Sequence, residues 1–212
     1  MKLVLASNNA KKLAELAALL APLRIELVSQ RELGIAEADE PHATFVENAL
    51  AKVRHAARAS GLPAIADDSG LCVDALGGAP GVASAHFAPL PPDARGLTDR
   101  EARRAAQDAA NNALLLERLR GHPDRRARFV STLVALRAAD DPEPLVALGR
   151  WDGEILGAPR GAGGFGYDPL VFVPALGATV AELGPDVKNA HSHRARAARQ
   201  MLGLMREVWR LG

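Results

Sequence analysis

The chain has 212 residues, of which 48% are hydrophobic and 24% are charged, a balance typical of a folded protein rather than a disordered one. The 26 Lys and Arg residues against 25 Asp and Glu residues give a net charge of +1. This near-neutral balance argues against a dedicated nucleic-acid or membrane-surface binder, so any anionic ligand must be bound by local lysines and arginines. The single cysteine, Cys72, lies in an apolar run, which predicts a packed thiol and excludes an intramolecular disulfide.

Apolar runs are short throughout the chain. The stretch that follows Met1 is too short for the apolar core of a signal peptide. No run approaches the roughly 18 residues that a membrane span needs. We therefore expect a cytoplasmic protein with no membrane partner.

The first part of the chain alternates predicted strands and helices. Thr44 and Glu47 have the spacing of a capping box at the start of a helix, and Gly61 follows its end. A tight turn at Ser69-Gly70 is expected to join two short apolar strands into a hairpin. The expected elements are a strand over 2–6, a helix over 10–21, a strand over 24–28, a helix over 44–60 and this hairpin from residue 64 onward.

The second part continues the alternation. A capping box at Thr98 and Glu101 predicts a long helix that ends near Arg120. Further elements are expected as strands over 128–137, 145–156 and 170–173, a glycine-rich loop over 157–166 and a helix over 192–211. Helices interleaved with strands predict an α/β fold around a mixed sheet, in a single domain over residues 1–212.

Two adjacent aspartates end the first apolar run of the expected hairpin. Because successive side chains of a strand point to opposite faces, Asp67 and Asp68 cannot both point into one cleft. We expect backbone donors to hold one carboxylate and the other to be presented to a metal or to water. The alternative is that both acids decorate a hairpin turn.

A polar segment between the first strand and the first helix is a candidate phosphate-binding loop. Backbone N–H groups at a helix N-terminus favour anions, and serine, asparagine and lysine side chains add donors and charge. The segment lacks the glycines of the Walker pattern. The alternative is an ordinary helix cap with solvated lysines. Its residues are Ser7, Asn8, Asn9, Ala10, Lys11 and Lys12.

The acidic loop before the second helix is a candidate metal site. Mg²⁺ takes one or two carboxylates and otherwise keeps water or binds substrate phosphates. Glu40 could pair with Asp68 in that way, whereas the capping box accounts more simply for Glu47. Lys52 lies four residues after Asn48 on one flank of the same helix.

Two later segments carry groups suited to a heterocyclic ligand. In the turn Gly163–Pro169, Phe165 offers a stacking surface and Asp168 an acceptor, and the glycines permit close approach of a ligand. A β-turn with a core aromatic is the alternative.

In residues 188–194, His193 and Arg194 can donate to a carbonyl or a phosphate, and Ser192 has the character of a helix N-cap. The spacing of the two histidines in this segment is weak evidence for a metal site.

These stretches, in this order, resemble the inosine triphosphate pyrophosphatase family, which hydrolyses deaminated purine nucleoside triphosphates. The resemblance is carried by SNNAKK (7–12), TFVENALAK (44–52), AIADDSGLCVDALGGAPG (64–81), FGYDP (165–169) and SHR (192–194). It implies an elongated, strongly twisted mixed β-sheet whose flanking helices form two lobes around a central cleft, usually in a homodimer. It also implies Mg²⁺-dependent cleavage of dITP, ITP or XTP to the monophosphate and pyrophosphate.

The resemblance also implies roles for individual residues. Asp68 is similar to the general base and metal-linked aspartate of the family, Lys52 to a catalytic phosphate contact, and Glu40 falls in the metal-binding region. Ser69 is implied to touch the substrate. The implied phosphate-binding residues are Ser7, Asn9 and Lys12, and the implied base-recognition residues are Phe165, Gly166, Tyr167, Asp168, Lys188, His193 and Arg194. Ser7 and Asn8 stand where threonine and glycine are common in the family.

Two rival interpretations remain. The septum-formation-inhibitor type of nucleotide pyrophosphatase opens with a similar strand and turn, but it expects paired arginines where Lys11 and Lys12 stand and it lacks the FGYD and SHR stretches. A nucleotide-binding protein without turnover is the other rival. The intact set of Asp68, Lys52 and Lys12 argues against it.

Overall fold

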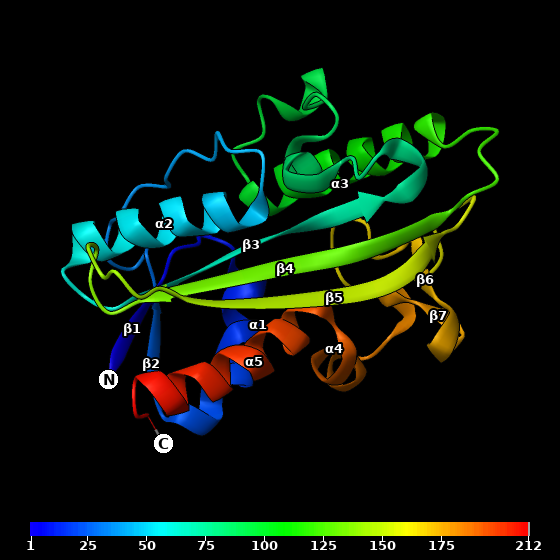
Figure 1. The fold of residues 1–212 in the computed structure, drawn as a ribbon. Helices are drawn as coiled ribbons and strands as arrows, with labels where there is room; N and C mark the ends of the chain where they lie inside the picture. Colours follow the sequence, from blue (N-terminus) through cyan, green and yellow to red (C-terminus); the bar gives the residue numbers. More distant parts are fainter. Residues whose placement is uncertain (212) are drawn as a thin grey trace. The chain divides into compact units, whose positions relative to one another are not determined.

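The structure is a computed structural model that describes residues 1–211 of the chain. Its strands form one mixed sheet of seven strands in the order β2-β1-β3-β4-β5-β6-β7 (Figure 1). The strands are β1 (Lys2–Leu5), β2 (Glu26–Ser29), β3 (Ala64–Val73), β4 (Arg126–Leu136), β5 (Leu145–Ile155), β6 (Val171–Val173) and β7 (Ala178–Thr179). β1 pairs in parallel with β2 and β3, whereas β6 pairs antiparallel with β5 and β7. The predicted α/β fold with a mixed sheet and flanking helices is confirmed.

Five α-helices accompany the sheet within residues 1–211. They are α1 (Ala10–Leu20), α2 (Phe45–Ser60), α3 (Arg100–Arg118), α4 (Pro185–His191) and α5 (His193–Val208). The sequence reasoning did not predict the short helix α4. No helix in the described part of the chain is both long and apolar enough to cross a membrane.

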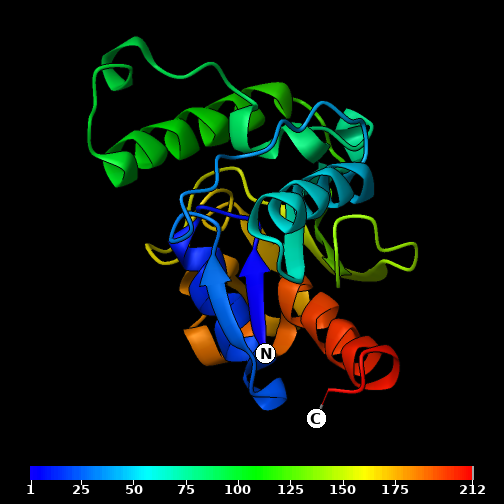
Figure 2. The same ribbon diagram turned by 90° about the vertical axis from the view of Figure 1, so that its left-hand side faces the viewer.

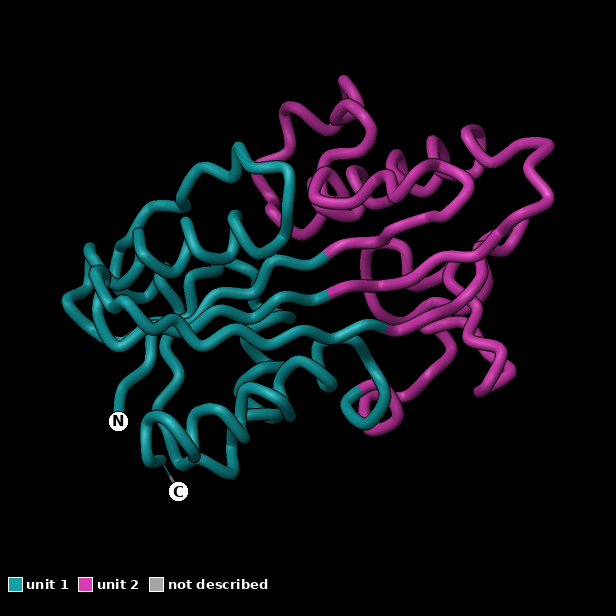
Figure 3. Tube along the Cα trace, in the orientation of Figure 1, with its two compact units in different colours: residues 1–69, 131–150, 189–212 teal, residues 70–130, 151–188 magenta. Residues whose placement is uncertain are grey.

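The chain divides into two compact units (Figure 3). The first comprises residues 1–69, 131–150 and 189–212, and the second comprises residues 70–130 and 151–188. β3, β4 and β5 each contribute residues to both units. Each unit has its own hydrophobic core.

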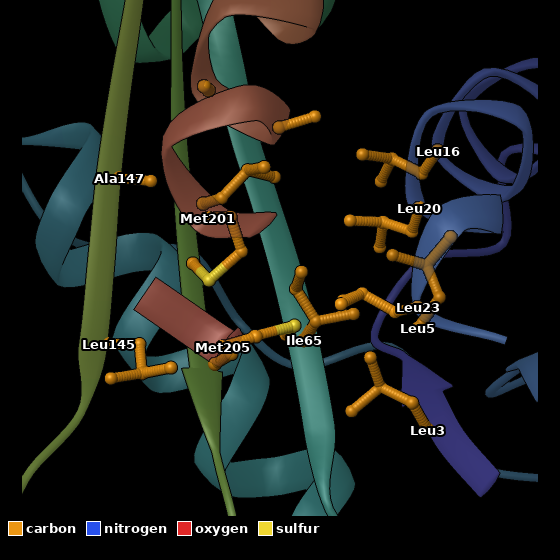
Figure 4. Packing of buried hydrophobic residues seen from close by; sticks show 14 of the residues in the cluster. Leu3, Leu5, Leu16, Leu20, Leu23, Ile65, Leu145, Ala147, Met201 and Met205 are labelled. Carbon is orange, nitrogen blue, oxygen red and sulfur yellow. The ribbon is translucent and has the colours of Figure 1, made fainter. Parts of the chain in front are cut away.

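Strand alternation builds the two cores of the first unit. Leu3 and Leu5 of β1 pack with α1 and α5, while Val4 between them packs with α2. Ile65 of β3 lies in the first of these clusters, and its neighbours Ala64 and Ala66 lie in the second. Figure 4 shows the first cluster, in which Met201 and Met205 of α5 lie near Ile65. In Figure 2, β1 and β2 run side by side in the same direction. Helices therefore cover both faces of these strands, as parallel strands require.

The core of the second unit gathers around α3. Leu115 of this helix and Leu119, its C-cap residue, are fully buried and pack with Leu71 of β3 and Trp151 of β5. Cys72 is also buried in this unit, which confirms the packed thiol. Tyr167 joins the same core, and its hydroxyl donates to the carbonyl oxygen of Ser84 at 2.9 Å.

Two local predictions were wrong. β3 runs unbroken from Ala64 to Val73, so there is no turn at Ser69-Gly70 and no hairpin. Gly70 instead allows close approach, because a Cβ there would lie 2.4 Å from both the Gly81 carbonyl oxygen and Ser84 Oγ. The N-cap of α3 is Asp99 rather than Thr98.

Candidate active site

Asp67 lies at the centre of a buried polar network in the first unit. Its side chain is fully buried and accepts hydrogen bonds from Ser131 Oγ at 2.7 Å and Arg194 Nε at 3.1 Å. Lys12 Nζ lies 3.0 Å from Asp67 Oδ2, and Ser69 Oγ donates to the same oxygen at 3.2 Å. The prediction that backbone donors hold this aspartate was wrong, because side chains from four segments do so.

The charges of this network keep Asp67 ionised. Burial acts to raise the pKa of the Asp67 carboxyl, but the cations of Arg194 and Lys12 and the hydrogen bond from Ser131 outweigh it and lower the pKa far below its usual range. Burial lowers the pKa of Lys12, with Arg194 and Lys52 acting in the same direction against the attraction of Asp67. The guanidinium of Arg194 is also bound by Glu15 of α1 and donates to Ser69 Oγ. α1, β3 and α5 are thereby joined through charged groups.

Asp68, the next residue of β3, has a different environment. Its Oδ1 accepts a hydrogen bond from Lys52 Nζ at 2.8 Å, and the same nitrogen lies 2.6 Å from Glu40 Oε2. Its Oδ2 is buried and accepts no hydrogen bond from the described residues. Burial raises the pKa of the Asp68 carboxyl and outweighs the stabilising charge of Lys52. Alternation along β3 has separated a fully paired aspartate from one that keeps an unused acceptor.

Lys52 connects the two carboxylates of the candidate metal site. Burial acts to lower its pKa, but Asp68 and Glu40 outweigh burial and raise it, so the ammonium is charged. Glu40 is largely exposed and Asp68 is buried. Glu47 accepts a hydrogen bond from the Thr44 hydroxyl, and Thr44 caps α2, so Glu47 belongs to the helix cap as expected.

The start of α1 has the features expected of an anion site. Asn9 is the N-cap, and its Oδ1 accepts hydrogen bonds from the backbone N–H groups of Lys11 and Lys12 at 3.0 and 3.3 Å. Asn9 N donates to Ser7 Oγ at 3.2 Å. Asn8 Oδ1 and Asn9 Nδ2 are buried and have no partner among the described residues. Lys12 is paired with Asp67, which excludes the alternative in which it is solvated.

In the second unit, the predicted turn is built around the carboxylate of Asp168. Asp168 Oδ2 accepts from Phe165 N at 3.0 Å and from Lys188 Nζ at 2.9 Å. The ammonium of Lys188 lies 4.7 Å from the centre of the Phe165 ring. A Cβ at Gly164 would lie 2.1 Å from Asp168 Oδ2, so only glycine allows this approach. The side chain of Tyr167, by contrast, belongs to the core.

His193 and Arg194 begin α5 in the first unit. Ser192 caps the helix, as predicted, and its Oγ accepts from Ala195 N at 3.1 Å. Both side chains are buried. The guanidinium of Arg194 is bound to Asp67, Glu15 and Ser69, so a role of Arg194 in base recognition stays a prediction and its evident role is to hold Asp67.

Sequence reasoning missed several residues that support Asp67 and the start of α5. Ser131 is a polar residue in an apolar strand, a signal that could have marked it. Gly149 of β5 allows α5 to approach, because a Cβ there would lie 1.8 Å from the carbonyl oxygen of His193. Glu15 gave no signal of its own, since its partner Arg194 lies on a distant helix.

The first unit therefore places a capped helix N-terminus, two largely buried lysines and a buried carboxylate with an unused oxygen on the mixed β-sheet of an α/β protein. The chain belongs to the Ham1 family, whose model matches residues 3–204. The resemblance found in the sequence is confirmed, and it sets aside the septum-formation-inhibitor alternative.

Relatives match the chain over its full length. The protein named dITP/XTP pyrophosphatase from Leptothrix cholodnii is 71% identical over 212 residues, covering 100% of both chains. The protein of the same name from Methylibium petroleiphilum is 70% identical and covers 99% of both. The solved structure of a HAM1 protein from Coxiella burnetii has a TM-score of 0.85 and 42% identity, and the match covers 98% of this chain and 100% of that one.

Proposed function

We propose that this protein hydrolyses deaminated purine nucleoside triphosphates, with dITP, ITP and XTP as substrates, to the monophosphate and pyrophosphate, and so removes them from the nucleotide pool. The observation that carries the proposal is Asp68 Oδ2, a buried carboxylate oxygen with no partner among the described residues, beside a charged Lys52. Native proteins seldom leave such an atom unpaired unless a ligand, an ion or water completes it. The names of the Leptothrix and Methylibium relatives support the substrate class.

The first unit supplies groups for the phosphates. The N-terminus of α1 supplies the positive end of a helix dipole, and Asn9 Nδ2 is a buried donor there with no partner among the described residues. Lys52 supplies a positive charge for the negative charge that develops on a leaving pyrophosphate. The position of Lys12 against Asp67 adds a second cation to the same region.

Asp68 and Glu40 fit a site for Mg²⁺. Glu40 Oε2 and Asp68 Oδ1 both lie within 3 Å of Lys52 Nζ, so the two carboxylates are close enough to share one ion. No group of three or more metal-binding side chains occurs within residues 1–211, so substrate phosphates and water would complete the coordination. When bound, the ion would neutralise charge on the phosphates and lower the pKa of a coordinated water.

Asp68 is the proposed general base. Its raised pKa brings the carboxylate closer to the range useful for accepting a proton near neutral pH. Oδ2 would accept the proton of the water that attacks the α-phosphorus, while Lys52 holds Oδ1 in place. Asp67, fully paired and held ionised, would fix the strand that carries Asp68 rather than accept a proton itself.

The turn from Phe165 to Asp168, together with Lys188, is the proposed base-recognition element of the second unit. His193 of the first unit is proposed separately as a donor to the base. Hypoxanthine and xanthine present a carbonyl at the 6-position, where adenine presents an amine. A protein donor that binds this carbonyl would face the amino group of adenine, which is also a donor. A buried mismatch of this kind can favour hypoxanthine and xanthine over adenine by about 10⁴-fold.

The decisive experiment incubates the purified protein with dITP and Mg²⁺ and measures pyrophosphate and inorganic phosphate separately. We expect stoichiometric dIMP and pyrophosphate, and slow turnover of dATP. Release of single phosphates would contradict the reaction, and binding of dITP without turnover would identify a nucleotide-binding protein instead. The homodimer and the cytoplasmic location stay predictions, and light scattering in solution tests the first.

A further inference from the structure

We propose that Asp108 and Asn112 of α3 are positioning residues for base selectivity, because together they hold the peptide groups of Gly166 in the turn that the proposed function assigns to the purine. This inference rests on that proposed function. Asp108 Oδ2 accepts a hydrogen bond from Gly166 N at 2.8 Å. Asn112 Nδ2 donates to the Gly166 carbonyl oxygen at 3.0 Å.

The two side chains form a matched pair on one helix. Residues four apart on an α-helix lie on the same face, one turn above the other. One residue supplies an acceptor and the other a donor, so the pair fits both polar groups of a single residue of the turn. A carboxylate that accepts from a backbone N–H makes a charge-assisted bond, which is stronger and more directional than a neutral one.

Gly166 is the point where the turn needs to be held. Its φ of 61° lies in the left-handed region that glycine adopts without strain. No described atom lies within 4 Å of the position its Cβ would take, so the glycine is required by its backbone conformation and not by lack of space. A glycine is also the most flexible residue in the chain, and the two bonds from α3 remove that freedom.

Other peptide groups of the turn are bound within the turn or by residues outside α3. Phe165 N donates to the Asp168 carboxylate, and Asp168 N donates to the Phe165 carbonyl oxygen at 3.2 Å. Ala181 N donates to the Asp168 carbonyl oxygen at 3.1 Å. Asp108 and Asn112 therefore link the turn to a long helix of the second unit, and they set where Phe165 and Asp168 are presented.

Asn112 keeps a further polar atom at this place. Its Oδ1 is buried and accepts no hydrogen bond from the described residues. A purely structural asparagine usually satisfies both halves of its amide, as Asn111 does by accepting from Ala88 N and donating to the Ser84 carbonyl oxygen. The unused oxygen indicates that a ligand or a water molecule beside the turn donates a hydrogen bond to Asn112 Oδ1.

The test compares Asp108→Ala and Asn112→Ala with the parent protein on three substrates: dITP, dATP and a deoxyribose triphosphate that lacks a base. We expect kcat/KM for dITP to fall about tenfold or more, mainly through KM, since small misplacement of a recognition element is costly. The ratio of kcat/KM for dITP to kcat/KM for dATP should fall as well. Turnover of the base-free triphosphate should stay within about twofold of the parent, because that substrate makes no contact with the turn.

Two matched variants control for the helix itself. Asp108→Asn keeps an oxygen that accepts from Gly166 N, so its selectivity should lie near that of the parent. Glu117→Ala removes an exposed carboxylate from the same helix and should change no substrate ratio. Thermal unfolding of all variants measures any loss of stability separately.

The outcomes separate the two proposals. A parent protein that hydrolyses none of the three substrates overturns the proposed function. An active parent whose alanine variants keep the dITP to dATP ratio overturns the positioning role, and so does an equal loss on the base-free substrate. If both alanine variants fail to fold, Asp108 and Asn112 support the fold alone and the proposal is wrong.

Discussion

Arg194 and Asp67 stand 127 residues apart in the sequence, yet Arg194 Nε donates to Asp67 Oδ2 at 3.1 Å and both side chains are almost completely buried. The contact joins the first turn of α5 to the middle of β3, next to the proposed general base. A buried charge pair is costly to break on one side, because the remaining charge is left without a partner. The pair therefore holds β3 in place at Asp67, the residue directly before Asp68.

Asp68→Asn should abolish most turnover and spare binding. The amide cannot accept a proton, so we expect kcat with dITP to fall by about 10²- to 10⁴-fold. Affinity for a non-hydrolysable dITP analogue, measured by calorimetry, should change by less than about tenfold. Asp140→Asn, an exposed aspartate between β4 and β5, is the control and should leave both values unchanged. A kcat within a few-fold of the parent would remove Asp68 from the mechanism.

Glu40→Gln should raise the Mg²⁺ concentration that gives the half-maximal rate by about tenfold, since Mg²⁺ binds carboxylates far better than amides. The measurement is a Mg²⁺ titration at saturating dITP. Glu47→Gln is the matched control, because its carboxylate accepts from Thr44 in the helix cap. An equal shift in both variants would show that Glu40 acts through the general charge of the loop and is not a ligand.

Asp67→Asn should lower stability in a pH-dependent way. The pKa of Asp67 is far below its usual range in the folded protein and about 3.9 in the unfolded chain. Its ionised form therefore stabilises the fold above about pH 5, and this contribution is lost as the pH falls toward the folded pKa. We expect a loss of about 3–5 kcal/mol at pH 7 and a smaller difference near pH 3.

Urea unfolding of the parent and Asp67→Asn at pH 7, 5 and 3 measures this difference. Asp140→Asn should follow the parent at every pH because it is exposed. A constant difference across the range would mean that shape, and not charge, accounts for the loss.

Gly149→Ala should destabilise the protein and displace the start of α5. The new Cβ would lie 1.8 Å from the His193 carbonyl oxygen and 2.6 Å from Ala197 N, both backbone atoms that cannot rotate away. We expect a loss of about 1–3 kcal/mol or more by chemical denaturation. Gly203→Ala is the matched control in α5, because outside the helix's own backbone no described atom lies within 4 Å of the position its Cβ would take. This substitution should stabilise the helix by about 0.5–1 kcal/mol. Equal effects of the two substitutions would refute the close approach at Gly149.

Patterns within a short stretch of chain predicted what depends on local geometry. Apolar periodicity located six of the seven strands, with β3 expected as two, and four of the five helices within residues 1–211. Thr44 and Ser192 cap their helices as the sequence indicated. The prediction of a hairpin was wrong because a Ser-Gly pair permits either a turn or a continuous strand. Packing of Gly70 against Gly81 and Ser84 decided for the strand.

The alternation rule alone required that Asp67 and Asp68 differ in environment, and this could be stated without a structure because it follows from backbone geometry. Which of the two is sealed and which keeps an unused oxygen was decided only by tertiary contacts from Arg194, Lys12 and Lys52. Those partners lie up to 127 residues away, and their charges, together with the burial of the two carboxyl groups, set the pKa values of Asp67 and Asp68. Charge and periodicity are local properties of a sequence, whereas desolvation and long-range pairing exist only once the chain has folded.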